Sequence, residues 1–305
     1  MAYPRTPHYT FQELGDGLHV GIARRTGDGI CNSGIVALGD ATLVFDTGLT
    51  PHAADDLRSA TIATLGGPPS LLANSHRHLD HVLGNQQFPG VPIFGTRGTR
   101  EIMLARHDET MAELTRSSLE RDIQLLEAQR DRRRSEEARK DLEVSLQMDR
   151  ALLAEVGNLW LTPPDRTFET RLVLPGSRGA ELLSFGAGHT EADAVLFLPH
   201  EKLLFAGDLV VIGVQPSMGS GDPQHWLTVL DEIDRLRPER IVPGHGPVVS
   251  GEGSRETREY VESVWAAASS PAGAPLPAAL RRWEGSLSLE QNLEFARGVR
   301  ATQGH

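Results

Sequence analysis

Glycine and proline are unevenly distributed along this chain of 305 residues, and their distribution constrains the fold more than any other feature. The chain contains 31 glycines and 19 prolines, but none lies between residues 99 and 156. Because both residue types interrupt helices, their absence over such a length predicts long helices there. The flanking parts carry short apolar runs separated by turn residues, which is typical of strands. We therefore expect a layered α/β domain that is interrupted by a helical insertion.

Strand-like runs lie on both sides of the insertion. We expect strands over residues 18–22, 33–38, 42–46, 71–73 and 92–96 before it, and over 171–174, 181–185, 194–198, 202–206 and 241–242 after it. Apolar side chains at helical spacing predict a helix over 223–237 and further helices near the C-terminus. The chain then divides into a first core half (1–98), the insertion (99–157), a second core half (158–255) and a helical tail (256–305).

The insertion itself is predicted to be two long helices. The arginine-rich segment 130–135 breaks the apolar stripe and is the expected turn between them, with a solvated charged surface. Ser117 and Glu120 have the spacing of a capping box, which predicts a helix start at that point. Apolar residues of the insertion either pack these helices on each other or line a substrate pocket. The residues concerned are Met103, Met111, Met148 and Leu152.

Composition excludes several classes of protein. The net charge of −11 disfavours nucleic acid as the main partner. No apolar run approaches the roughly 18 residues that a membrane helix needs, and we expect no membrane association. The N-terminal sequence lacks a basic region followed by an apolar stretch, so we expect no secretory signal. The single cysteine, Cys31, excludes an intrachain disulfide, fits a cytoplasmic location, and is expected to be a buried apolar residue.

Residues 76–81 read His-Arg-His-Leu-Asp-His and follow directly on a predicted strand. On an extended chain His76 and His78 project to the same side, whereas Asp80 and His81 come after the turn and face a neighbouring position. This arrangement suits two adjacent metal ions better than one.

Three further residues of metal-ligand type lie in matching settings. His189, Asp208 and His245 each follow a predicted strand and have glycine beside them, which lets the backbone turn sharply and leaves the side chain unobstructed. The remaining histidines lack such a context and are expected to lie outside the site, although His225 and its neighbour Trp226 follow a loop that should approach Asp208. These remaining residues are His8, His19, His52, His107, His200, His225 and His305.

Taken together and in this order, these segments resemble the metallo-β-lactamase superfamily of hydrolases. The motifs that carry the resemblance are Phe-Asp-Thr-Gly at 45–48, the cluster at 76–81, Gly-His-Thr at 188–190, Gly-Asp at 207–208 and Pro-Gly-His-Gly at 243–246. The resemblance extends over residues 17–250 except for the insertion. It implies an αββα sandwich, two sheets face to face with helices outside, and a dinuclear metal site at one edge.

The resemblance also implies a role for each ligand. His76, His78 and His189 would hold the first metal ion, Asp80, His81 and His245 the second, and Asp208 would bridge the two. Asp46 would support the ligands from behind, and Asp80 would also orient a metal-bridging hydroxide. The implied ions are two divalent metals, zinc in the first place, with iron, manganese or cobalt according to supply.

The implied activity is hydrolysis of a small ester, thioester or lactone by that hydroxide. The alternatives are a mononuclear iron persulfide dioxygenase, a β-lactamase or phosphodiesterase activity, and a non-catalytic scaffold. β-Lactamases of the superfamily usually carry Cys or Ser at the position of Asp208 and are exported, which counts against that role. The insertion would either cover the metal edge as a lid or form the face of a homodimer.

Overall fold

A computed structural model describes residues 3–24, 30–271 and 274–303, and within them two β-sheets pack face to face. The strands are β1 (Tyr9–Gly15), β2 (Leu18–Ala23), β3 (Ser33–Ala37), β4 (Thr42–Phe45), β5 (Leu71–Ala73), β6 (Ile93–Thr96), β7 (Arg166–Phe168), β8 (Arg171–Val173), β9 (Glu181–Leu183), β10 (Val195–Leu198), β11 (Leu203–Phe205), β12 (Arg240–Val242) and β13 (Val249–Ser250). Every predicted strand is present, and β1, β7 and β13 are additional.

The strand order explains why functional groups gather at one edge. The first sheet has the order β1-β2-β3-β4-β5-β6-β7 and is parallel from β4 to β7. The second has the order β13-β12-β11-β10-β9-β8, in which β11 and β12 are parallel and β9 runs in the same direction because it is antiparallel to β10. The carboxyl ends of β4, β5, β9, β11 and β12 therefore point toward the same edge of the sandwich.

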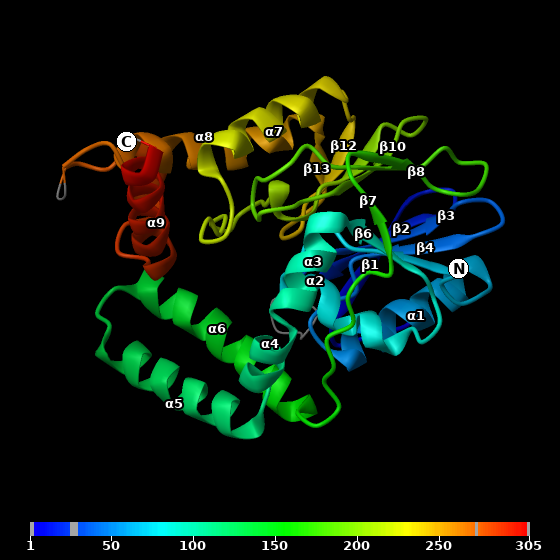
Figure 1. Cartoon of the computed structure of the whole chain (residues 1–305), viewed down its shortest axis with the longest axis horizontal. Helices are drawn as coiled ribbons and strands as arrows, with labels where there is room; N and C mark the ends of the chain where they lie inside the picture. The colour runs from blue at the N-terminus through cyan, green and yellow to red at the C-terminus, as the bar shows by residue number, and fades with distance from the viewer. Residues whose placement is uncertain (1–2, 25–29, 272–273, 304–305) are drawn as a thin grey trace.

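Some helices cover the outer faces of the two sheets, and others lie away from the sandwich (Figure 1). The helices are α1 (Pro51–Leu65), α2 (Leu79–Val82), α3 (Arg97–Ala105), α4 (His107–Glu113), α5 (Arg116–Arg132), α6 (Glu136–Glu155), α7 (Pro223–Arg235), α8 (Ser254–Ala267) and α9 (Leu287–Gln303), with short 3-10 turns η1 (Leu83–Gln87), η2 (Gly207–Leu209), η3 (Gly251–Gly253) and η4 (Ala278–Trp283). Helix α1 packs on the first sheet, and α7 and α8 pack on the second. The αββα sandwich is thus confirmed.

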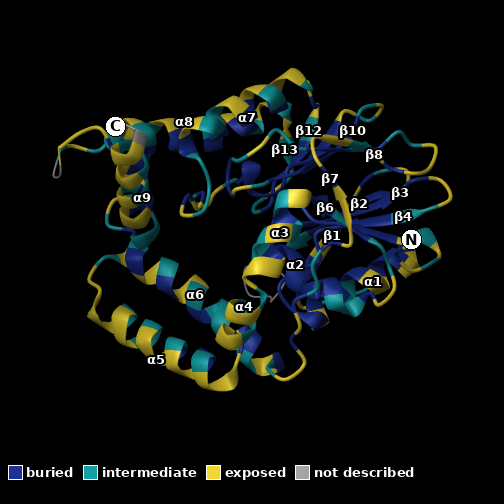
Figure 2. Ribbon diagram, in the orientation of Figure 1, coloured by how far each residue is buried: buried dark blue, intermediate teal, exposed yellow. Residues whose placement is uncertain are grey.

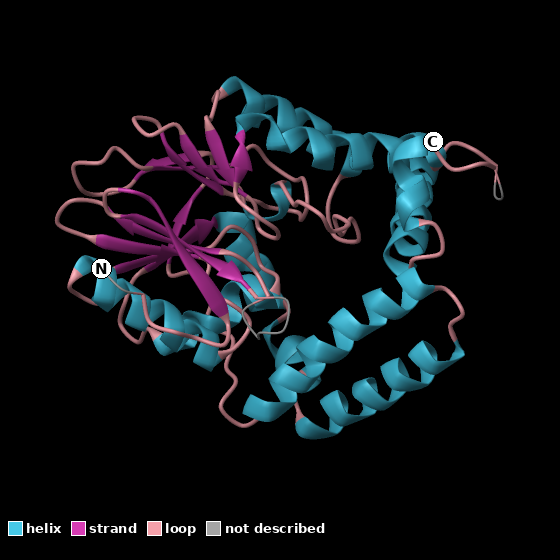
Figure 3. Cartoon of the chain, turned by 180° about the vertical axis from the view of Figure 1, so that it is seen from behind, coloured by secondary structure: helices cyan, strands magenta, loops and turns pink. Residues whose placement is uncertain are grey.

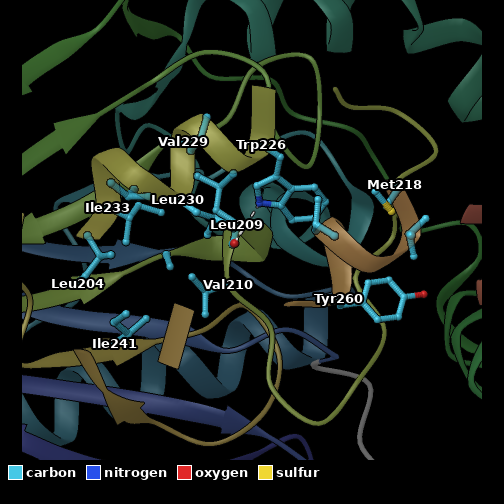
Figure 4. Close-up of a cluster of buried hydrophobic side chains, with 14 of the residues drawn as sticks. Leu204, Leu209, Val210, Met218, Trp226, Val229, Leu230, Ile233, Ile241 and Tyr260 are labelled. Atoms are coloured by element: carbon cyan, nitrogen blue, oxygen red, sulfur yellow. Dashed lines mark hydrogen bonds between the residues drawn. The ribbon is translucent and has the colours of Figure 1, made fainter. Parts of the chain in front are cut away.

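Separate hydrophobic layers hold this sandwich together. Between the sheets, Phe45 and Phe205 face each other with ring centroids 6.1 Å apart, and Gly34 is needed because a Cβ there would lie 2.7 Å from the Phe205 ring. Outside the second sheet, Trp226 of α7 is fully buried among aliphatic side chains, as Figure 4 shows. Figure 2 shows that the strands are buried, whereas α5 is largely exposed.

The insertion begins with α3, two residues before the predicted boundary, and continues as α4, α5 and α6. The turn predicted at 130–135 is present between α5 and α6. The predicted helix start is confirmed to within one residue, since α5 begins at Arg116. The predicted capping box is wrong, because the cap is Thr115, whose hydroxyl accepts a hydrogen bond from the Ser118 amide. A threonine one turn earlier satisfies the free amide, so Ser117 lies inside the helix.

The tail meets the insertion at the far end of the molecule from the sandwich. In Figures 1 and 3, α7, α8, α9 and α6 follow one another in an arc from the second sheet round to the insertion. The Ser288 amide donates to the Asp141 carboxylate at 3.0 Å, and Arg133 lies 3.8 Å from Glu290. The homodimer through the insertion remains a prediction. No helix in the described part of the chain is both long and apolar enough to cross a bilayer.

Candidate metal centre

The structure brings all seven predicted ligands to the shared edge of the two sheets. His76 follows β5, and the short helix α2 then presents Asp80 and His81. His189 lies in the loop between β9 and β10, Asp208 lies in η2 after β11, and His245 follows β12. Their nitrogen and oxygen atoms form two groups in which all ligand atoms lie within 4.8 Å of one another.

The first group consists of three histidines and Asp208. The Nδ1 atom of His78 lies 3.1 Å from His76 Nε2 and 2.9 Å from His189 Nε2. Asp208 Oδ2 lies 3.5 Å from His189 Nε2. Donor atoms of a tetrahedral zinc site with bonds of about 2 Å are roughly 3.3 Å apart, so these separations fit one ion.

The second group consists of Asp80, His81 and His245. Asp80 Oδ2 lies 3.5 Å from His81 Nε2 and 3.4 Å from His245 Nε2. Asp208 reaches this group as well, because its Oδ1 lies 3.2 Å from His81 Nε2 and its Oδ2 lies 3.2 Å from His245 Nε2. Asp208 therefore lies between the two groups, at the position expected of a bridging carboxylate.

The donor set fits divalent metal ions on chemical grounds. Imidazole nitrogens and carboxylate oxygens are the ligands that zinc accepts. His81 Nε2 and Asp208 Oδ1 are buried and make no hydrogen bond within the described residues, although buried polar atoms rarely remain unpaired. The two atoms lie 3.2 Å apart, a separation at which one bound cation would satisfy both.

Asp46 orients the His-rich segment 76–81 through Ser75 and His81, on the side away from the candidate metal positions. It follows β4 with a left-handed φ of 60°, a conformation that aspartate tolerates better than most residues. One carboxylate oxygen accepts from the Ser75 amide at 2.7 Å, and the other accepts from the Ser75 hydroxyl at 2.7 Å and from His81 Nδ1 at 2.8 Å. The same hydroxyl accepts from His76 Nδ1 at 2.9 Å. Both imidazoles therefore turn Nε2 toward the centre.

Backbone carbonyls orient the other two Nε2 ligands. His189 Nδ1 donates to the Ser217 carbonyl at 2.9 Å, and His245 Nδ1 donates to the Ile30 carbonyl at 2.9 Å. Asn32 secures the latter contact, because its side-chain amide donates to the carbonyls of Pro243 and Gly246. Each of the four histidines that present Nε2 to the site is thus fixed by a hydrogen bond at its Nδ1 atom.

Two glycines make room for the candidate ligands that follow strands of the second sheet, Asp208 and His245. A Cβ at Gly244 would lie 1.9 Å from Asp208 Oδ1 and would displace the carboxylate. Gly207 has a left-handed φ of 51°, and a Cβ there would lie 2.5 Å from Ser75. These two positions explain why glycine precedes Asp208 and His245.

The two groups differ in their electrostatics. Burial and neighbouring imidazoles hold the pKa of His76 well below its ordinary value, and burial lowers the pKa of His78 to about 4 and that of His189 to about 3. In the second group burial also opposes protonation. There the acidic neighbours prevail and raise the pKa of both His81 and His245. The three imidazoles of the first group are therefore neutral at physiological pH, whereas the imidazoles of the second group bind protons more readily.

The remaining histidines lie outside the two groups, as predicted, and His305 lies outside the described residues. His8 pairs with Asp56, His19 with Tyr3 and His52 with Glu155. His107 contacts Trp160, and His200 lies near Gly179.

His225 and Trp226 come close to the site without joining it. His225 Nδ1 donates to the Ala187 carbonyl at 2.6 Å, and the Trp226 ring packs edge-on to His189. Cys31 is fully buried, as predicted, and burial raises its pKa to about 11, so it is a thiol at neutral pH.

A cavity of about 130 Å³ lies beside the first metal group, between His78 and the start of the insertion. Ile102 and Met103 of α3 and Leu161 give it apolar walls, and Arg77 and Arg106 are also part of its lining. Of the four apolar insertion residues named above, only Met103 lines this cavity. All four belong to one apolar cluster that α2 and the helices of the insertion form.

The two sheets, their outer helices and the His/Asp groups at the shared edge define an αββα sandwich with a candidate metal centre at its edge. The chain belongs to the metallo-beta-lactamase superfamily, whose model matches residues 26–245. Members of this superfamily are mostly hydrolases. A curated relative, the Beta-lactamase-like protein 2 homolog of Caenorhabditis elegans, is 35% identical over 80 residues. That match covers 25% of this chain and 24% of the relative.

Solved structures of low sequence identity share the fold. FIM-1 from Pseudomonas aeruginosa, a metallo-beta-lactamase in its mono-zinc form, has a TM-score of 0.58 at 18% identity, covering 86% of this chain and 98% of that one. A metallo-beta-lactamase from Pontibacter korlensis has a TM-score of 0.57 at 19% identity, covering 83% and 99%. TMB-1 has a TM-score of 0.59 at 16% identity, covering 84% and 98%.

Apart from Asp46, sequence reasoning missed the residues that support the ligands. Ser75 adjoins the first motif, and Asp193 accepts hydrogen bonds from Gly188 and Thr190 on either side of His189. The spacing of Thr190 and Asp193 is a local signal that could have identified the second contact. The role of Ser217 had no local signal, because it acts through its backbone carbonyl.

Proposed function

We propose that this protein is a dinuclear metal-dependent hydrolase of a small ester, thioester or lactone. The observation that carries the proposal is the position of Asp208, within 3.5 Å of a histidine nitrogen of each group. A carboxylate between two complete donor sets is the arrangement that holds two ions side by side. Zinc is the favoured metal, and iron, manganese and cobalt suit the same donors.

When bound, such a pair of ions supplies a hydroxide nucleophile at neutral pH and polarises the scissile carbonyl. The chain's own residues provide the rest. His76, His78 and His189 hold the first ion, and Asp80, His81 and His245 hold the second, with Asp208 between them. Asp80, whose Oδ2 lies within 3.5 Å of both histidines of the second group, would also accept a hydrogen bond from the nucleophile and orient it.

The residues around the centre suit a small, partly apolar substrate. His78 and His245 are the ligands with the most exposed side chains, so substrate approaches between them. The cavity beside His78 has room for a short aliphatic group and is walled by Ile102, Met103 and Leu161. A small acyl group placed there brings its carbonyl to the metal edge.

The test is a comparison of metal-loaded and chelator-treated protein on panels of esters, thioesters and lactones, with β-lactams and phosphodiesters alongside. We expect metal-dependent hydrolysis in the first three panels and its loss in His76→Ala. Oxygen uptake with a persulfide and one bound iron would replace this proposal by the dioxygenase. A metal-free protein that stays inert after reconstitution would identify a scaffold.

A further inference from the structure

The loop between β11 and α7 contacts the first metal group from outside. In this loop, residues 210–222, the Ser217 carbonyl accepts the Nδ1 proton of His189, and Ser220 Oγ lies 3.2 Å from His78 Nε2. The loop also packs closely on the His189 segment, since the Asp222 amide donates to the Gly188 carbonyl at 3.1 Å. Its position therefore sets the orientation of two of the three histidines.

Little regular structure holds this loop in place. Between η2 and α7 the only strand-type pairing in the described residues is a single bridge from Val211 to His245. A carbonyl that orients a metal ligand needs a fixed backbone, so the loop must be secured by contacts from elsewhere in the fold.

Asn292 of α9 supplies those contacts. Its side-chain nitrogen donates to the Pro216 carbonyl at 2.8 Å, and its side-chain oxygen accepts from the Met218 amide at 3.0 Å. The two bonds lie on either side of Ser217. Among side chains an amide is suited to this position, because it offers a donor and an acceptor on one planar group.

The network around Asn292 is buried and reaches into the tail. Asn292 is 4% exposed, and its nitrogen also donates to the Tyr260 hydroxyl at 3.0 Å. Gln215 Oε1 accepts from the hydroxyls of Tyr260 and Ser286, each at 3.0 Å. Met218 is fully buried near Tyr260, as Figure 4 shows. Tyr260 of α8, Asn292 of α9 and Ser286, the residue before α9, thus all hold this one loop.

We propose that Asn292 is a positioning residue for the metal centre, which fixes the Ser217 carbonyl and through it His189. The C-terminal helical tail is then part of the metal-binding apparatus. This inference rests on the proposed function, because it concerns the affinity of the first metal group, but it makes a separate claim about which part of the chain sets that affinity.

The test measures binding of Zn²⁺ alone, by competition with a chelator, in variants that isolate each group. His245→Ala leaves the first group intact, and His76→Ala leaves the second. In the His245→Ala background we expect Asn292→Leu to weaken Zn²⁺ binding about tenfold or more, as loss of support behind a ligand does. In the His76→Ala background the same change leaves affinity unaltered.

A spectroscopic readout and a matched control make the result specific. With Co²⁺ in the first group, Asn292→Leu shifts the visible absorption bands, because His189 changes its orientation. Gln291→Leu, on an exposed position of the same helix, changes neither affinity nor spectrum. If Asn292→Leu does not fold, Tyr260→Phe removes only the hydroxyl that supports Asn292 and Gln215, and we expect a smaller loss confined to the first group.

Two results would overturn the proposal. One is a folded Asn292→Leu variant that binds Zn²⁺ in the first group as the parent does. The other is an equal weakening of both groups together with a lower melting temperature of the metal-free protein, which would indicate a general structural role. Failure of the proposed function is distinguishable, since the parent protein would then bind Zn²⁺ but hydrolyse no ester, thioester or lactone, while the expected effect of Asn292→Leu on Zn²⁺ affinity would be unchanged.

Discussion

The imidazole of His81 donates its Nδ1 proton to Asp46 at 2.8 Å, and both side chains are almost completely buried. This contact connects the end of β4 to the His-rich segment 76–81 and leaves His81 Nε2 facing Asp208. Because the same carboxylate also binds Ser75, one aspartate fixes the strand exit and the ligand together.

Replacing Asp46 by asparagine tests this contact. Asparagine tolerates the left-handed backbone at this position and keeps the size of the side chain, but it weakens the hold on the His81 Nδ1 proton. We expect the second metal to bind about 10- to 100-fold more weakly. The first metal should be weakened less, because Asp46 reaches His76 only through the Ser75 hydroxyl. Metal titration of the purified variant measures both affinities, and equal loss at both groups would contradict the assignment.

Acidification should remove the second metal before the first. Burial lowers the pKa of His78 to about 4 and that of His189 to about 3, so these ligands carry no proton to displace above about pH 5. The acidic neighbours of His81 and His245 raise the pKa of both imidazoles despite burial. In the metal-free protein the second group therefore binds protons more tightly than free histidine does, and metal must displace them.

The measurement is metal content after dialysis between pH 8 and pH 5. As the pH falls through the raised pKa values, protons compete for the second group and its occupancy declines. The first group keeps its ion through this range. Earlier loss from the first group would show that the electrostatic difference between the groups has the opposite sign.

The cavity beside His78 predicts a change of substrate range. In Ile102→Trp, on α3, the larger side chain fills the cavity next to His78, so that a longer acyl chain no longer fits there. We expect KM for longer acyl esters to rise about tenfold while acetyl esters are turned over as before. Leu104→Trp is the matched control, since Leu104 lies on the same helix and is 49% exposed. Equal effects of the two changes would show that the cavity does not bind substrate.

Trp226 links the outer layer of the second sheet to the site and should dominate its stability. Its indole nitrogen donates to the Leu209 carbonyl at 3.1 Å, and no part of the side chain is exposed. Trp226→Phe leaves that carbonyl unpaired and a void beside His189, so we expect the free energy of unfolding to fall by about 2 kcal/mol. Urea denaturation measures it.

The control for that change is Trp160→Phe. Trp160 is 58% exposed, and a substitution there should stay within about 0.5 kcal/mol. A Trp226→Phe variant as stable as this control would contradict the packing described for α7.

The sequence predicted the site better than its surroundings. All seven candidate ligands, which the structure brings together, could be named because each follows a strand-like run within a few residues, and His76 to His81 lie in one motif. Asn292 had no such signal, because it acts on Pro216 and Met218 far away in the sequence. Contacts of that kind depend on how α9 packs, which no local pattern encodes.

Helix α1 shows a different reason for failure. Only strands were predicted before residue 99, over five short ranges, but Pro51–Leu65 is a helix. Its buried face consists largely of alanine and threonine, so its apolar periodicity is weak. The signals that were present are at its ends, where Thr50 caps the helix before Pro51 and Gly66 ends it in a left-handed conformation.

The most direct test of the account is the number of metal ions per chain, measured by elemental analysis of protein purified without added metal and again after reconstitution with Zn²⁺. Two ions per chain, falling to one in His245→Ala, is the result that two donor groups sharing Asp208 predict. A single ion in the reconstituted parent protein, unchanged in His245→Ala, would contradict the dinuclear centre.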